Sequence, residues 1–226
     1  MNRNAQSVVL AAIGAVALRV GLTDEYARYV NDWMRWPLVV SGAAMVGLAF
    51  LAVFSSRHDA DRSSPAVWAL LLPVVIAFVV QPPALGAYVA ERRSNDVSAV
   101  RYDEAAVAPL REGQVHDMLV SEFVAYASAY AEVLTGAQVR LRGFVTHDEG
   151  GWYVTRLSIS CCAADALAFR VRVDPGDGEQ APADEQWVEV VGTWVPGTGE
   201  GIGTQDAPVL SAAEVTLTGP PRRPYE

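Results

Sequence analysis

A stretch of 19 residues, 36–54, contains no charged side chain, and it constrains the fold more than any other part of the sequence. An α-helix of roughly 20 apolar residues crosses the hydrocarbon core of a bilayer, because each residue adds about 1.5 Å along the axis. Trp33 and Trp36 stand at the start of the stretch, where interfacial aromatic residues gather. The sequence therefore predicts a membrane-spanning helix over 36–54.

A shorter apolar run precedes this span, at residues 8–22. Its one charged residue, Arg19, lies near the end, where a long side chain can reach the membrane surface. A secretory signal peptide is the competing interpretation, since the run is short and follows Arg3. Because a second apolar run follows at once, we expect a transmembrane helix.

A third apolar run covers residues 66–82 and ends at two adjacent prolines. Proline removes a backbone donor and clashes with the preceding turn, so a helix is expected to end there. We therefore expect about three helices, at 8–22, 36–54 and 66–82, in a transmembrane region over residues 1–93. The chain is then a multi-pass protein of the cell membrane, surrounded by lipid. The side of the membrane on which the rest of the chain lies stays open.

Charge separates this region from the remainder of the chain. Residues 1–93 carry a net charge of +2 and residues 94–226 carry −11, which together make the total of −9. Binding of nucleic acid depends on clustered Lys and Arg that neutralise phosphates, and the acidic part contains no such cluster. Nucleic acid is therefore not an expected partner.

The acidic part has the pattern of a small β domain. Residues 94–116 are polar and lack periodicity, which is typical of a linker, and residues 117–134 carry apolar side chains every three or four positions, which predicts a helix. Short alternating runs follow, bounded by turn residues. They predict five strands in a small antiparallel barrel or sandwich, at 139–145, 154–161, 169–173, 187–194 and 215–217.

The alternation also assigns side chains to the two faces of the strands, since successive residues of a strand point to opposite sides. One face is expected to form a single core of Leu141, Leu157, Ile159, Phe169 and Val171. Four arginines are expected outside that core, namely Arg140, Arg156, Arg170 and Arg172.

The residues most specific for chemistry are two adjacent cysteines, Cys161 and Cys162, followed by Asp165. Neighbouring Cα atoms are about 3.8 Å apart, whereas disulfides prefer about 5.5 to 6 Å, so a disulfide between the two is strained. On a regular strand the two thiols point to opposite faces. A chemical site here therefore requires the chain to bend between Ser160 and Ala163.

Thiolates and a carboxylate can bind zinc, so Cys161, Cys162 and Asp165 are candidate ligands for zinc or another metal. A closed zinc site takes four ligands, and His147 is the histidine nearest to them along the chain. The structural alternative makes Cys161 a small apolar side chain buried behind Ile159, with the two sulfurs too far apart to bond. No other cofactor is expected.

Motifs of the common catalytic classes are missing from the sequence. It contains no glycine-rich phosphate loop, no G-x-S-x-G turn and no paired-histidine zinc motif. His58, Asp59 and Asp61 lie between the second and third apolar runs, where they either touch a passing cation or form an ordinary polar loop. We therefore expect a protein that is not an enzyme.

Several groups of residues match one known pattern: Arg142-Gly143-Phe144-Val145, Arg156 with Ile159 to Ala166, Trp187-Val188 with Val191-Gly192, and Pro221 to Tyr225. On these residues the chain resembles the YcgQ-like family of bacterial permease subunits, membrane proteins with a C-terminal domain of unknown function. The Cys-Cys-x-Ala-Asp-Ala string is the specific part of the resemblance.

The resemblance implies an OB-like fold for residues 117–226. The expected fold class is then a membrane α-helical N-terminal region plus a small all-β domain, a five-stranded OB-like barrel preceded by a helix. The resemblance also implies a multi-spanning permease partner, so the expected function is an accessory subunit of a two-component permease that docks through its helices. The alternative is a membrane-anchored metal-binding or thiol-redox module that uses Cys161 and Cys162.

Overall fold

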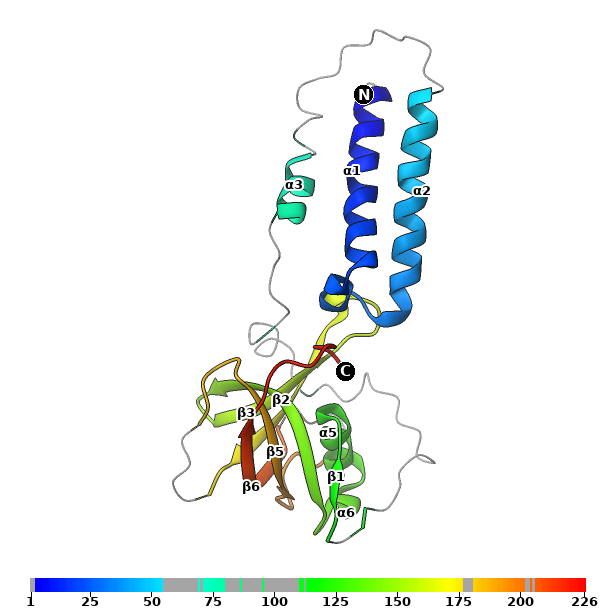
Figure 1. The fold of residues 1–226 in the computed structure, drawn as a ribbon. Coiled ribbons are helices and arrows are strands. Elements are labelled where there is room, and N and C mark those ends of the chain that lie inside the picture. The colour runs from blue at the N-terminus through cyan, green and yellow to red at the C-terminus, as the bar shows by residue number, and fades with distance from the viewer. Residues whose placement is uncertain are drawn as a thin grey trace. The chain divides into compact units, whose positions relative to one another are not determined.

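A computed structural model describes residues 3–54, 69, 71–79, 86, 95, 110–111, 113–176, 181–201, 204 and 206–226. The chain divides into two compact units, Met1–Ala84 and Leu85–Glu226, and each is described by itself (Figure 1). The polar loop with His58, Asp59 and Asp61, and most of the predicted linker, lie outside the described residues.

The first unit contains two long helices that run antiparallel (Figure 1). α1 spans Arg3–Leu22 and α2 spans Arg35–Phe54, and the 3-10 helices η1, Asp24–Arg28, and η2, Asp32–Met34, join them. Among the residues that the structure describes, these two helices are long and apolar enough to cross a membrane. The third apolar run contains α3, Leu71–Val79, and its remaining residues lie outside the described part except position 69.

Glycine lets α1 and α2 approach closely. A Cβ atom at Gly14 would lie 2.8 Å from the carbonyl oxygen of Gly42, and a Cβ atom at Gly42 would lie 3.0 Å from the carbonyl oxygen of Gly14. A backbone oxygen cannot turn aside as a flexible side chain can, so both positions favour glycine at this packing distance. Other faces of the pair are apolar and exposed; their large side chains include Val8, Ile13, Val40, Leu48, Phe50 and Leu51.

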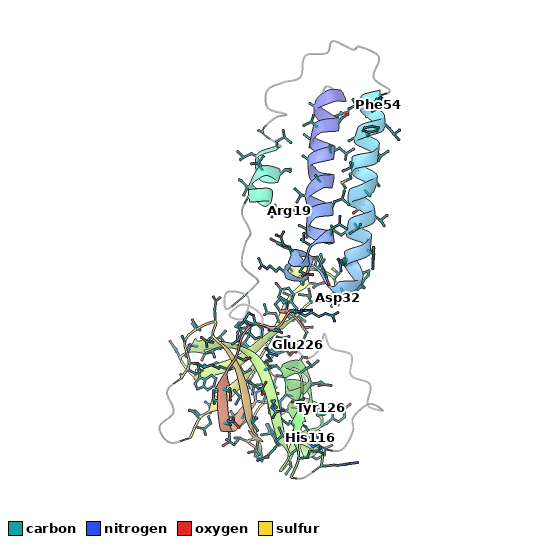
Figure 2. All side chains as sticks on the ribbon, in the orientation of Figure 1. Arg19, Asp32, Phe54, His116, Tyr126 and Glu226 are labelled. Carbon is teal, nitrogen blue, oxygen red and sulfur yellow. The ribbon has the colours of Figure 1, made fainter. Side chains whose placement is uncertain are left out.

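Polar contacts gather at the end of the pair where η1 and η2 lie. Arg19 forms an ion pair with Glu25 at 3.3 Å, and the Arg35 Nε donates a hydrogen bond to the carbonyl oxygen of Gly21 at 2.9 Å. Figure 2 labels Arg19 near this end and Phe54 at the opposite end. The only charged residue inside the first apolar run therefore has its charge at the end of the helix, where it need not be buried in hydrocarbon.

The second unit is built on one mixed sheet of six strands (Figure 1). The strands are β1, Val115–Asp117, β2, Gln138–Asp148, β3, Gly151–Ser158, β4, Leu167–Asp174, β5, Trp187–Trp194, and β6, Val209–Leu217. β2 pairs with β3, β3 with β4, β4 with β6, β6 with β5, and β5 again with β2, so the series of pairings returns to its first strand. β1 pairs with the first residues of β2.

This sheet differs from the predicted five antiparallel strands. β1 is an additional strand at the point where the predicted linker ends. Two of the pairings, β1 with β2 and β4 with β6, are parallel, because the chain between the strands of each pair returns to the same end of the sheet. An alternating pattern predicts that a strand exists and not the direction of its neighbour, so the prediction of an antiparallel sheet was wrong in these two places.

The prediction of a single helix over 117–134 was also wrong. The structure has α5, Val120–Ala129, and α6, Ala131–Leu134, preceded by β1. Tyr130 separates the two helices with a φ of −140° and a ψ of 45°, which lie outside the helical region. The apolar spacing of three and four residues continues across this break, which is why the sequence pattern did not reveal it.

The buried residues of the second unit form two clusters. α5 packs against the sheet, and the larger cluster includes Phe123, Leu141, Val154, Phe169, Val171 and Leu210. The smaller cluster contains Phe144, Leu157, Ile159, Ala166, Ala168 and Tyr225. All five residues of the predicted core are buried, but Leu157 and Ile159 belong to the smaller cluster. The prediction of one core was wrong, because Tyr225 and its neighbours cover the second face of β3.

Arg156 was predicted to lie outside the core, and this was wrong too. Arg156 is only 7% exposed. Its Nε lies 3.4 Å from Oε1 of Glu226, and its guanidinium carbon lies 5.1 Å from the ring centroid of Trp187. Burial lowers the pKa of Arg156, while the charge of Glu226 opposes this. The arginine is tolerated here because a carboxylate from the far end of the sequence accompanies it.

Candidate functional site

The candidate site lies in the turn that leads from β3 to β4. β3 ends at Ser158, and a short 3-10 helix, η6, covers Ala163–Asp165. Cys162, the residue before η6, has an extended backbone with a φ of −155° and a ψ of 171°. Because the regular strand has ended before Cys161, the two thiols are not held on opposite faces. Their Sγ atoms lie 3.7 Å apart.

Asp165 holds this turn together through backbone hydrogen bonds. Its Oδ1 accepts a hydrogen bond from the N–H of Ser160 at 3.0 Å, and its Oδ2 accepts one from the N–H of Cys161 at 2.8 Å. The N–H of Asp165 donates to the carbonyl oxygen of Cys162 at 3.0 Å. These bonds satisfy the backbone N–H groups of Ser160, Cys161 and Asp165 beyond the end of β3. They also fix the position of the carboxylate beside the thiols.

The same contacts set the protonation states of the turn. Partial burial raises the pKa of Asp165, but hydrogen bonds from the Cys161 thiol and from the N–H groups of Cys161, Ser160 and Cys162 outweigh it, so the pKa lies below its ordinary value. The hydrogen bond to Asp165, followed by the contact with Cys162, raises the pKa of Cys161 to about 11. At neutral pH and without a metal, Asp165 is therefore ionised and Cys161 is a neutral thiol.

The three side chains can act together as ligands. One ligand atom from each of Cys161, Cys162 and Asp165 lies within 4.8 Å of the other two. Both cysteines are free and half-buried, so solvent and dissolved ions can reach this turn. The arrangement brings two sulfur ligands and one oxygen ligand to one place, which is a donor set that zinc accepts.

His147 does not join this group. It lies opposite Trp152 in the β2–β3 hairpin, at the beginning of β3, whereas Cys161 follows the end of that strand. The length of β3, roughly 20 Å at about 3.3 Å per residue, separates the two positions. The Nδ1 of His147 instead lies 3.1 Å from Oδ1 of Asp184. Nearness in sequence was misleading, because a hairpin carries the chain away by the full length of its strand.

A separate pocket of about 340 Å³ lies beside the start of α5. Its lining comprises Asp117, Met118, Leu119, Glu122, Arg140, Arg142 and Glu189. Arg140 forms ion pairs with Asp117 at 3.0 Å and with Glu189 at 3.1 Å. Since two carboxylates balance this arginine, the pocket is not a positively charged site for an anion. Sequence analysis did not find it, because its residues come from three separate segments of the sequence.

Comparison with known proteins finds a family match that covers most of the second unit. Residues 111–226 match a family described as the DUF1980 C-terminal domain. This range contains all six strands, α5, α6 and the turn with Cys161, Cys162 and Asp165. No curated protein matches the chain.

Proposed function

This chain belongs to the DUF1980 C-terminal domain family, and we propose that it is an accessory subunit of a two-component membrane permease. In this proposal a multi-pass N-terminal region docks on a larger multi-spanning partner in the cell membrane. The second unit is a soluble domain that the helices hold at the membrane. The observation that carries the proposal is the pair α1 and α2, which is apolar along its length and keeps large apolar side chains exposed.

The contact between α1 and α2 supports a partner rather than transport through this pair alone. At the contact between Gly14 and Gly42, the neighbouring groups are backbone atoms and the side chains of Leu18, Met45 and Val46. A path for a solute or an ion needs polar groups or water along it. Within this contact there are no side-chain groups of that kind, so a conducting path would come from a partner.

The exposed faces of the two helices have the composition that such a partner requires. Phe50 and Leu51 on α2, and Ile13 on α1, each expose more than a third of their surface. Lipid or the apolar helices of another membrane protein can cover these side chains, and van der Waals packing then holds the helices together. The closed order of strand pairings supports an OB-like barrel for the soluble domain. Its acidic composition favours a protein partner over nucleic acid.

Co-purification tests the proposal. The full chain carries an affinity tag, is crosslinked in native membranes, and is recovered in mild detergent for mass spectrometry. We expect a single multi-spanning membrane protein in amounts comparable to the chain. Leu51→Asn, on the exposed face of α2, should reduce that recovery, whereas Glu149→Ala in a loop of the second unit should not. Recovery of the chain only as a free monomer would contradict the proposal.

A second candidate function is a membrane-anchored metal-binding or thiol-redox module. The observation that favours it is the separation of 3.7 Å between the sulfurs of Cys161 and Cys162 beside Asp165. The pKa of Cys161 is raised to about 11, so little thiolate is present for thiol exchange at neutral pH. A cation at these three side chains would itself displace the thiol proton, so metal binding fits this turn better than thiol exchange. A redox module predicts that a mild oxidant at pH 7 removes two hydrogens from the chain. An unchanged mass would exclude it.

A further inference from the structure

We propose that Cys161, Cys162 and Asp165 form an open, three-ligand site for a thiophilic divalent cation, with Zn²⁺ as the expected ion. This proposal deepens the second candidate function, from a general metal-binding or redox module to a defined ion and ligand set. It does not depend on the permease partner, so each proposal can fail without the other.

The spacing of the two sulfurs matches a zinc site. Zn–S bonds of about 2.3 Å at a tetrahedral angle place two sulfur ligands about 3.8 Å apart. The Sγ atoms of Cys161 and Cys162 are 3.7 Å apart. An oxygen ligand on the same ion would lie about 3.6 Å from each sulfur, and the ligand atoms of all three side chains lie within 4.8 Å of one another. The three ligand atoms are therefore close to the separations that a single zinc ion requires.

Asp165 is placed for this role by bonds that metal binding does not need to break. Each carboxylate oxygen carries two lone pairs. One pair on each oxygen accepts a hydrogen bond from the backbone, at Ser160 and at Cys161. The carboxylate also accepts a hydrogen bond from the Cys161 thiol; that bond ends when the thiol loses its proton to bind a metal, which makes a lone pair available to the cation. Hydrogen bonds of this kind orient a ligand carboxylate before the ion arrives, as they do in established metal sites.

The donor set selects the type of ion. Mg²⁺ and Ca²⁺ take oxygen ligands, whereas thiolates favour Zn²⁺ and Cu⁺. A carboxylate beside the thiolates favours Zn²⁺ over Cu⁺, since Cu⁺ prefers sulfur. In the part of the chain that the structure describes, the cluster has three members. Zn²⁺ takes four ligands, so water or a group from another molecule would fill the fourth position, and the ion could exchange.

Equilibrium dialysis of the full chain in detergent tests the site. The chain is reduced, freed of metal with a chelator, and dialysed against Zn²⁺ alone or Mg²⁺ alone. We expect roughly one Zn²⁺ per chain and no Mg²⁺. Cys161→Ser and Cys162→Ser nearly preserve volume and remove one sulfur ligand each, so each should weaken Zn²⁺ binding by about tenfold or more. His147→Ala is the matched control, because His147 lies at the other end of β3, and it should leave Zn²⁺ binding unchanged.

A spectroscopic measurement distinguishes a variant that has lost the metal site from one that fails to fold. Co²⁺ bound to thiolates absorbs in the near ultraviolet, and either serine variant should lose that absorption while its far-ultraviolet circular dichroism stays the same as in the unaltered chain. Zn²⁺ binding that survives Cys162→Ser would overturn the site. So would no Zn²⁺ binding by a chain that still recovers its permease partner. Zn²⁺ binding without any partner would contradict only the accessory-subunit proposal.

Discussion

The Arg156 guanidinium and the Glu226 carboxylate form a buried ion pair in which Nε and Oε1 are 3.4 Å apart. The carboxylate also accepts hydrogen bonds from the N–H groups of Val120 and Ser121, each at 3.1 Å, in the first turn of α5. Helix N-termini carry partial positive charge, so a carboxylate is stabilised there. One side chain thus connects β3, the start of α5 and the segment that ends in Tyr225 and Glu226; Figure 2 labels Glu226.

Removing this carboxylate should destabilise the second unit strongly. We expect Glu226→Ala to lower the free energy of unfolding by about 3 to 5 kcal/mol, because Arg156 then stays buried without its charged partner. Urea unfolding of the full chain in detergent, followed by tryptophan fluorescence, measures the change. Glu149→Ala removes an exposed carboxylate and should change stability by no more than about 0.5 kcal/mol. Equal effects of the two substitutions would contradict the structural role of the pair.

The close contact of α1 and α2 predicts different outcomes for two glycines. Gly14→Ala places a methyl group against a backbone oxygen of α2, so we expect a loss of about 1 to 3 kcal/mol from overpacking. A Cβ atom at Gly47 would meet nothing within 4 Å, so Gly47→Ala should be neutral or slightly stabilising, because alanine favours helix more than glycine. Thermal unfolding in detergent micelles compares them. A destabilised Gly47→Ala together with an unaffected Gly14→Ala would show that another face of α2 contacts α1.

The hydrogen bond from Cys161 to Asp165 predicts slow alkylation of this thiol. Only thiolate reacts with iodoacetamide, and the pKa of Cys161 is raised to about 11, chiefly by Asp165. In the metal-free chain at pH 8.5, Asp165→Asn should therefore speed alkylation of Cys161 by roughly tenfold, since one pKa unit changes the thiolate fraction about tenfold. Fragment-ion mass spectrometry distinguishes Cys161 from Cys162. Asp184→Asn is the control, and an equal acceleration there would refute the explanation.

Acid should weaken the second unit through Asp148 and Asp165. Burial raises the pKa of Asp148, but hydrogen bonds from Tyr153, Gly150 and Arg170 hold it below its ordinary value of 3.8, and the pKa of Asp165 is also lowered. A carboxyl group whose pKa is lower in the folded state stabilises fully above its unfolded value, and this contribution is lost as pH falls through the folded pKa. The urea concentration at the midpoint of unfolding should therefore decrease as the pH falls below about 4. Asp148→Asn should make that fall shallower, and an unchanged slope would contradict this.

Stability should also decrease at alkaline pH, because the pKa of Cys161 is raised rather than lowered. The pKa of Cys161 is higher in the fold than the ordinary value of 9.0. Its stabilising contribution is therefore complete below about pH 9 and is lost as pH rises toward 11. In the metal-free chain, the urea concentration at the midpoint of unfolding should decrease over this interval. The midpoint of the Cys161→Ser variant should decrease less. If the serine variant lost as much stability at alkaline pH, groups other than Cys161 would be responsible for the loss.

Local patterns in the sequence determined the elements of this protein. The uncharged stretch at 36–54 predicted a helix long enough for a bilayer, and α2 occupies Arg35–Phe54. Alternation around Leu141, Phe169 and Val190 predicted strands where β2, β4 and β5 lie. Such predictions succeed because the period of a helix or a strand depends only on neighbours within a few positions. The adjacent cysteines and Asp165 were also visible, since their spacing is short.

Only the tertiary structure decided which of these residues meet. The end of β3 at Ser158 brings the sulfurs of Cys161 and Cys162 together, while the β2–β3 hairpin takes His147 away. Burial of Arg156 depends on Glu226, and the smaller core cluster depends on Tyr225, both far along the chain. A periodic pattern shows which side chains avoid water, but it does not show what covers them. That depends on contacts between distant segments, whose free energy no local pattern contains.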